Sequence, residues 1–201
     1  MRVVLVVCVL LASVGAAAEP PTFDRAASLI ARGRAAEDAG NTLSALGYYR
    51  DAVAAAPRRD VGYVALGEAY LRLGEPSRAL EVLLSGSRWT VRGETLWLAL
   101  HATYQALHDD ARALDALRKL RRMEPESTRG LSALADEAEQ RGAFLEALAA
   151  RRSLLALTGA EDQRARVRAL ELLLGNADPV RAKLACSTGT PVERALARCP
   201  L

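Results

Sequence analysis

The side chains that most often carry reactive or metal-binding chemistry are scarce in this sequence. Its only histidines are His101 and His108, and its cysteines are Cys8, Cys186 and Cys199. A structural zinc site takes about four ligands of these two types. Because the histidines lie far from Cys186 and Cys199 along the chain, the pattern does not indicate a metal site. We therefore expect the protein to hold neither a metal ion nor another cofactor.

No group of residues in the sequence suggests a catalytic centre. Catalysis would need a nucleophile beside a base, a set of metal ligands or a glycine-rich phosphate loop after a strand, and we find none of these. Asp109 and Asp110 lie at a turn between two predicted helices, where carboxylates stabilise a helix start. His101 stands alone and is better explained as a half-buried side chain between helices. The sequence therefore predicts a protein that is not an enzyme and has no catalytic residues.

The N-terminal residues 1–18 have the pattern of a secretory signal peptide. Arg2 precedes an uncharged apolar run, and Ala16-Ala17-Ala18 supplies a cleavage site of small residues. The run is shorter than the roughly 20 apolar residues of a membrane-spanning helix. We expect no membrane span once the signal is cleaved, with a retained anchor as the alternative. The predicted location is the periplasm or the exterior of a bacterial cell.

Export has a consequence for the cysteines. Cleavage of the signal removes Cys8 and leaves Cys186 and Cys199 in an oxidising compartment. An even number of cysteines in such a compartment most simply forms one disulfide, and two free thiols are the alternative. We predict a disulfide between Cys186 and Cys199.

Composition favours helices and argues against nucleic acid as a partner. Apolar residues make up 51% of the chain and aromatic residues only 4%, and alanine and leucine, which favour helix, dominate. Lysine and arginine total 27 against 24 acidic residues, a formal net charge of +3. Acidic and basic residues alternate along the predicted helices, whereas nucleic-acid binding usually needs a basic face. We expect no nucleic acid to bind.

A repeat of about 34 residues, a length typical of helical repeat arrays, organises the chain between residues 26 and 161. When the sequence is shifted by this length, four frames align without insertions, and each has alanine followed by leucine at its positions 20 and 21. Three frames have glycine at position 15, where it ends the first of two predicted helices. The frames are residues 26–59, 60–93, 94–127 and 128–161, and their alanines at position 20 are Ala45, Ala79, Ala113 and Ala147.

The repeat resembles the tetratricopeptide repeat, a helix–turn–helix unit of the same length. The family has a large residue at position 4, then Leu-Gly and then Tyr, and one frame shows Tyr63, Leu66-Gly67 and Tyr70 at that spacing. One helical hairpin cannot bury its apolar face alone, so neighbouring hairpins must stack. The resemblance implies an all-α fold, a right-handed αα-hairpin solenoid of four such repeats within residues 19–161.

A C-terminal helical cap is predicted over residues 162–201. Residues 162–174 have a helical apolar pattern that includes Val167 and Leu170, and Gly175 ends it. Two shorter helices that carry the two cysteines are expected after it. Because the end of a solenoid needs a polar outer face, we interpret this tail as a disulfide-stabilised cap. A separate recognition element is the alternative.

The resemblance also implies where a partner would bind. In the family, the first helix of each repeat lines the concave face, and positions 2, 5, 9, 12 and 13 contact ligands. Here the apolar residues at these positions lie in the middle of the face, which suits a helix or extended peptide with apolar anchors. The alternative is that they pack against the next repeat. The predicted groove residues are Arg34, Glu37, Val61, Val64, Glu68, Leu71, Arg72, Thr95, Leu98, Gln105 and Asp136.

These patterns predict a non-catalytic interaction or scaffold protein of the cell envelope that binds an unidentified protein or peptide in the concave groove. Chaperone-binding members of the family hold a C-terminal carboxylate with lysine and asparagine at positions 5 and 9. Here those positions include Arg34, Val64 and Glu68, so we do not expect carboxylate capture. Self-association into a homo-oligomer is one alternative function, and an accessory subunit of an enzyme is another.

Overall fold

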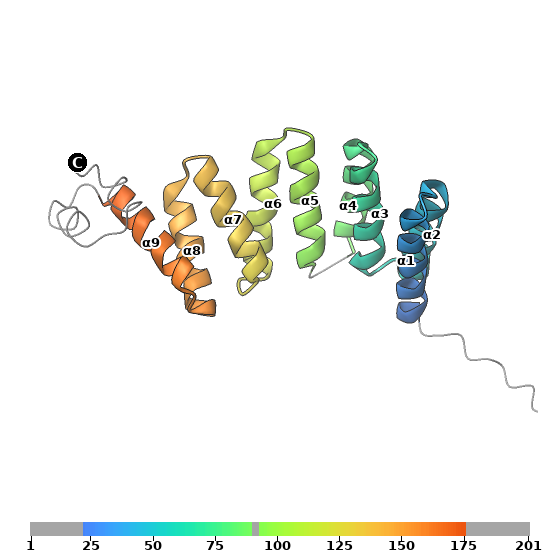
Figure 1. Cartoon of the computed structure of the whole chain (residues 1–201), viewed down its shortest axis with the longest axis horizontal. Coiled ribbons are helices and arrows are strands. Elements are labelled where there is room, and N and C mark those ends of the chain that lie inside the picture. Colours follow the sequence, from blue (N-terminus) through green and yellow to red (C-terminus); the bar gives the residue numbers. More distant parts are fainter. Residues whose placement is uncertain (1–21, 90–92, 176–201) are drawn as a thin grey trace, which may run out of the picture.

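The computed structural model describes residues 22–89 and 93–175, and every regular element within these ranges is an α-helix. The helices follow one another in short hairpins along a row (Figure 1). We call α1, α3, α5 and α7 the first helices and α2, α4, α6 and α8 the second helices. Their bounds are α1 Thr22–Asp38, α2 Thr42–Ala55, α3 Asp60–Arg72, α4 Pro76–Ser87, α5 Glu94–Ala106, α6 Asp110–Met123, α7 Thr128–Gln140, α8 Phe144–Thr158 and α9 Glu161–Leu174.

The helix starts follow the period of the sequence. Helices α3, α5 and α7 begin at Asp60, Glu94 and Thr128, which are the first residues of the second, third and fourth frames of the repeat. Helix α1 begins before the first frame, at Thr22, directly after Pro21, a residue type that suits the boundary of a helix. Each first helix packs mainly against the second helix that follows it. The row is therefore a stack of similar hairpins.

Small residues sit where the two helices of a hairpin cross. The alanines at position 20 of the four repeats are all fully buried. At Gly67 an added Cβ atom would lie only 2.7 Å from Leu83 Cγ, and at Gly33 it would overlap the Tyr49 ring. A larger side chain at these positions would force the helices apart, because packed helix interiors leave no room for an extra methyl group.

The same turn geometry joins the two helices of every repeat. Gly40, Gly74 and Gly142 at position 15 have φ values of 72 to 74°, and His108 takes the equivalent place with a φ of 57°. This left-handed conformation suits glycine and strains a residue with a Cβ atom. The following helices begin with residues that suit a helix start: α4 has Pro76 in its first turn, and the Asp109 carboxylate, predicted at such a start, caps α6 by accepting from Arg112 N.

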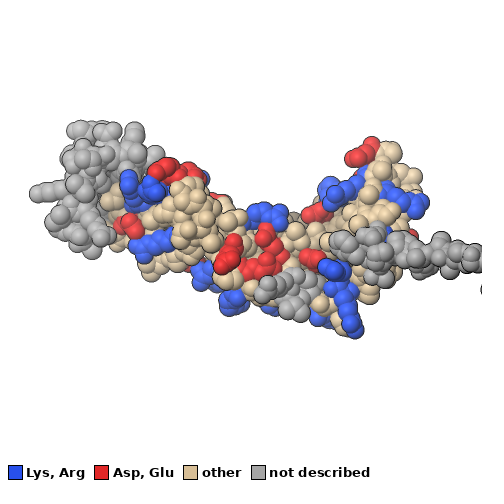
Figure 2. Space-filling model, turned by 90° about the horizontal axis from the view of Figure 1, so that it is seen from below, with Lys and Arg blue, Asp and Glu red and all other residues tan. Residues whose placement is uncertain are grey.

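The apolar core runs along the row without a break. Its buried clusters each draw on neighbouring hairpins, and Leu98 packs against two of them. The first helices α1, α3 and α5 also pack side by side, more closely than any two second helices. A row whose first helices lie closer together must curve toward them, and Figure 2 shows the resulting crescent with one hollowed edge.

Helix α9 continues the stack after the last repeat. It coincides with the helix predicted over residues 162–174, and its Val167 and Leu170 are buried against α7 and α8. Its start at Glu161 falls at the end of the fourth frame, so it takes the place that a further first helix would occupy. The predicted signal peptide, the rest of the predicted cap and the Cys186–Cys199 pair lie outside the described residues.

Candidate interaction cleft

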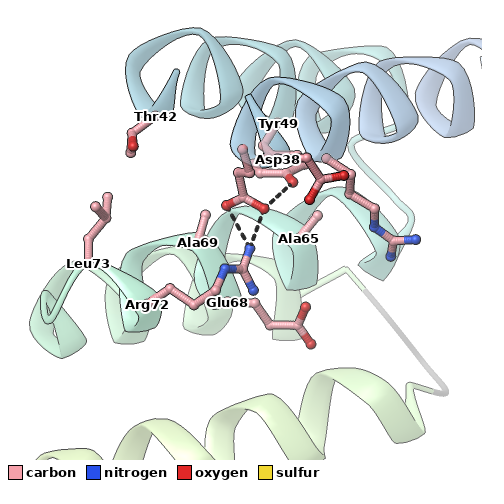
Figure 3. Close-up of a pocket in the computed structure, with 10 residues that line it drawn as sticks. Asp38, Thr42, Tyr49, Ala65, Glu68, Ala69, Arg72 and Leu73 are labelled. Carbon is pink, nitrogen blue, oxygen red and sulfur yellow. Dashed lines mark hydrogen bonds and ion pairs between the residues drawn. The ribbon is translucent and has the colours of Figure 1, made fainter. Parts of the chain in front are cut away.

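A cleft of about 530 Å³ opens between α1 and α3 on the inner side of the crescent. Alanines of α3 form its floor, and longer polar side chains of both helices form its walls (Figure 3). We call it the α1–α3 cleft. Its lining residues are Arg34, Glu37 and Asp38 of α1, Thr42 and Tyr49 of α2, Ala65, Glu68, Ala69 and Arg72 of α3, and Leu73 directly after α3.

One ion pair spans the cleft. Arg72 Nη2 donates to both carboxylate oxygens of Glu37, at 2.7 and 2.8 Å, and Tyr49 Oη donates to Glu37 Oε2 at 2.9 Å. Figure 3 draws these bonds as dashed lines that join Arg72 and Tyr49 to the carboxylate between them. Both Glu37 oxygens are therefore used inside the protein, and the charges of Glu37 and Arg72 offset each other.

Tyr49 supports this ion pair from below. Its side chain is almost fully buried and packs under Gly33. Burial, followed by the hydrogen bond to Glu37, raises the pKa of Tyr49 to about 12. The phenol therefore stays protonated at neutral pH and remains a hydrogen-bond donor to the carboxylate.

Three charged side chains of the cleft have no such partner. Within the described ranges, Arg34, Asp38 and Glu68 are exposed and make no hydrogen bond or ion pair. Arg34 and Glu68 occupy position 9 of successive repeats, on α1 and α3. Leu73 adds an exposed apolar side chain at the opposite end of the cleft, beside Thr42 (Figure 3). These four side chains are available to a ligand.

The structure thus brings four predicted groove residues into one site, namely Arg34, Glu37, Glu68 and Arg72. The predicted apolar anchors are placed differently. Val61 and Leu71 are half-buried against the core of the first two repeats, Val64 packs on the next cluster, and Leu98 packs between two clusters. Most of the apolar surface of these side chains is therefore buried within the array, as in the alternative that the sequence left open. Contact with a partner stays a prediction for these four residues.

The remaining predicted groove residues are tied to neighbouring helices. Thr95 Oγ1 donates to Asp60 Oδ2 at 3.1 Å, and Gln105 Nε2 donates to Glu137 Oε2 at 2.8 Å. Asp136 accepts from Arg151 at 2.5 Å and from Arg166 at 3.2 Å. Partner binding at these positions would therefore compete with bonds inside the protein.

Bonds of this kind recur along the inner face with the period of the repeat. Three pairs join residues that are 35 positions apart, so each links one first helix to the next: Glu37 with Arg72, Asp60 with Thr95, and Glu94 with Arg129. Several of these side chains, such as Glu37, Arg72 and Thr95, were predicted only to contact a partner. Complementary charges at this separation were the signal for two of these pairs, Glu37–Arg72 and Glu94–Arg129.

A polar cluster also joins the middle of the array. Glu137 of α7 is almost fully buried and accepts from Gln105 of α5 and from Arg141, whose Nε lies at 2.8 Å. His101 Nδ1 donates to the Ala113 carbonyl of α6 at 3.3 Å, and its Nε2 lies 3.8 Å from Glu137. His101 is half-buried, as predicted. None of these residues lines the α1–α3 cleft, so we interpret the cluster as structural.

Sequence reasoning missed part of the lining of the cleft. Tyr49 belongs to a second helix, and Thr42 and Leu73 belong to the ends of turns, so the positions that implied ligand contact on first helices did not include them. Ala65 and Ala69 form the floor of the cleft and also lie outside the positions that implied ligand contact. The signal for Tyr49 was its hydroxyl at a position that is apolar in the next two repeats, Leu83 and Leu117.

The described residues show neither a metal site nor a membrane-spanning helix. In residues 22–89 and 93–175, no group of three or more histidine, cysteine, aspartate or glutamate side chains is arranged to hold a metal ion. Over the same part of the chain, no helix has the length and apolar character needed to cross a membrane.

Comparisons with known proteins give the fold. No protein-family model and no curated protein sequence matches this chain. A solved tetratricopeptide repeat protein from Parabacteroides merdae is similar over 82% of this chain, with a TM-score of 0.61 and 20% identity, and this chain spans 66% of its length. The protein MamA is similar over 83% of this chain and 96% of its own, with a TM-score of 0.58 and 17% identity.

A third similar structure is YrrB, described as a tetratricopeptide repeat protein with an unusual peptide-binding site. It matches 86% of this chain and 90% of its own length, with a TM-score of 0.55 and 16% identity. All three likenesses lie below a quarter identity and carry the fold alone. Together with the regular spacing of the hairpins, they show that this chain is an all-α solenoid with the tetratricopeptide repeat fold.

Proposed function

We propose that this protein is a non-catalytic interaction scaffold of the cell envelope, and that it binds a segment of a partner protein on the inner side of its crescent. The observation that carries the proposal is the α1–α3 cleft. There, three charged side chains, Arg34, Asp38 and Glu68, line a cavity without being used inside the described part of the protein. Other polar groups that were predicted to bind a partner, such as Gln105 and Asp136, already have partners inside the protein.

The size of the cleft supports a peptide segment as ligand. A volume of about 530 Å³ falls in the range of roughly 300–1,000 Å³ that small ligand sites occupy, so it accommodates a few residues of a longer chain. YrrB, which shares the fold, is described as having a peptide-binding site. The rest of a partner segment would lie along the inner side of the crescent.

Export completes the proposal. The pattern of residues 1–18 favours a cleaved signal peptide, and we place the mature protein in the periplasm or outside the cell. Fractionation followed by N-terminal sequencing tests this part. A mature chain that begins at Glu19 in the soluble envelope fraction is expected. A chain that keeps residues 1–18 in the membrane fraction would contradict it.

Photo-crosslinking in cells tests the binding site. A photoreactive amino acid is placed at Glu68 in the cleft or, as the matched control, at Glu81, an exposed residue of the second helix α4. We expect a discrete crosslinked adduct from position 68 and none from position 81. Equal adducts from both positions would show non-specific contact. The absence of an adduct from position 68, with adducts from second helices, would place the binding surface elsewhere.

A further inference from the structure

The charges that line the α1–α3 cleft do not balance. Three carboxylates, Glu37, Asp38 and Glu68, face two guanidinium groups, Arg34 and Arg72. Arg72 is held by both oxygens of Glu37, so this pair is neutral. What remains for a ligand is one positive charge against two negative charges. A partner gains most from this cleft when its own segment is positively charged.

Apolar surface lies beside these charges. Leu73 has 43% of its surface exposed although it lines the cleft, and Ala65 and Ala69 form the floor next to it. In Figure 3, Leu73 and Thr42 face each other at one end, and Glu68 lies toward the other end. An apolar side chain and a charged one can therefore be held at opposite ends of the same cleft.

We infer that the α1–α3 cleft selects a partner segment in which a lysine or arginine lies close to an apolar residue. The inference rests on the proposed function and specifies the chemistry of its partner. The basic side chain lies against the Glu68 carboxylate, Asp38 adds to the negative charge of the cleft, and the apolar side chain lies on Leu73 and the alanine floor. Arg34 then disfavours a second basic residue next to the first, because it repels a positive charge.

The alternative partners fit the cleft less well. An acidic segment would meet two unpaired carboxylates, and Arg72 is not free to receive it while Glu37 holds it. A purely apolar segment would bury the Arg34, Asp38 and Glu68 charges without compensation, which costs free energy. A lysine or arginine beside an apolar residue avoids both penalties.

Selection from a library of random short peptides displayed on phage tests the inference without knowledge of the natural partner. The bait is the mature chain. Each enriched peptide is then tested against the Glu68→Trp variant, in which the indole fills the cleft, and peptides that lose binding are classed as dependent on the cleft. Because Glu68 is exposed, the variant should fold, and circular dichroism checks this.

The outcomes separate this inference from the proposed function. Peptides that depend on the cleft should contain lysine or arginine next to an apolar residue well above the frequency of the unselected library. Cleft-dependent peptides with no basic excess, or with an acidic excess, overturn the inference and leave the proposed function standing. If no enriched peptide depends on the cleft, the proposed function is wrong and the inference falls with it.

Affinity measurements on one enriched peptide complete the test. Glu68→Gln and Asp38→Asn keep the shape of the cleft and remove a charge, so each should weaken binding by about fivefold, the effect of one partly exposed ion pair. Glu81→Gln, on the second helix α4, should leave the affinity unchanged. Equal losses in all three variants would contradict recognition by the cleft carboxylates.

Discussion

Position 24 of the repeats shows how one buried place holds residues of different chemistry. Tyr49, Leu83, Leu117 and Arg151 occupy it in the four repeats, and all four are almost fully buried. Arg151 is accommodated because its guanidinium donates to Asp136 and Glu139 of α7 and to Gln163 of α9, the helices that flank it. A buried guanidinium with this many acceptors is satisfied, so the place tolerates a charge.

We predict that Arg151→Ala destabilises the protein by about 3 kcal/mol, because it leaves a cavity and removes the bonds that join α7, α8 and α9. Arg151→Leu should cost less than about 1.5 kcal/mol, because leucine fills the same place in two other repeats. Urea denaturation of both variants measures the difference. If leucine proves as destabilising as alanine, the ion network and not the packing determines stability at this place.

The turn at His108 is the second test at this scale. Its φ of 57° costs a residue with a Cβ atom about 1 kcal/mol, and glycine fills the same position in three other repeats. His108→Gly should therefore stabilise the protein by about 0.5–1 kcal/mol, measured by thermal or urea denaturation. The control Gly74→Ala should destabilise it by about 1 kcal/mol. A less stable His108→Gly variant would show that the histidine makes a compensating contact.

At the scale of helices, the first helices are held together by polar bonds at a regular separation as well as by apolar packing. The pair Glu94–Arg129 joins α5 to α7 at the surface. We predict that Glu94→Gln lowers stability by about 0.5–1 kcal/mol in low salt and by much less in about 1 M salt, because exposed ion pairs are screened. A double-mutant cycle with Arg129→Gln measures the coupling. A loss that does not change with salt would contradict an electrostatic origin.

His101 makes the junction of α5, α6 and α7 sensitive to pH. Burial lowers the pKa of His101 below its usual value, although the hydrogen bond to Ala113 and the charge of Glu137 act in the opposite direction, and Arg141 adds to the lowering. The unfolded chain therefore binds the proton more readily than the folded protein. Stability should fall as pH decreases through the usual histidine range, about 6.5, toward the lower pKa of the folded state.

The variant His101→Gln tests this dependence. It should remove the part of the stability loss below about pH 6.5 that histidine protonation causes, because no group at position 101 then titrates. Urea denaturation at several pH values measures it. An identical pH profile for the variant and the original protein would mean that His101 is not the group responsible.

At the scale of the whole molecule, the fold could be predicted from the sequence, and the candidate site only in part. A period of one helical hairpin with alanine at each crossing is a local pattern repeated along the chain, so it specifies stacked hairpins directly. The cleft depends on which side chains remain unpaired after neighbouring repeats come together. Arg34 and Glu68, which were predicted as groove residues, line the cleft, while the internal bonds of Thr95, Gln105 and Asp136 were not foreseen.

The α1–α3 cleft lies between the first helices of the first two repeats. Helix α1 packs mainly against α2 and only slightly against α3, whereas α3 and α5 pack more closely. The Glu37–Arg72 pair spans the cavity between α1 and α3 without filling it. A partner that binds there would contact two repeats at once and should hold their first helices together.

Hydrogen–deuterium exchange of the whole chain, with and without a bound peptide from the selection, tests the central claim most directly. We expect slower exchange in the inward-facing parts of α1 and α3, around Arg34 to Asp38 and Ala65 to Leu73, and little change in α6 and α8. Protection confined to the second helices or to α7 and α9 would contradict the account, because the partner would then bind away from the α1–α3 cleft.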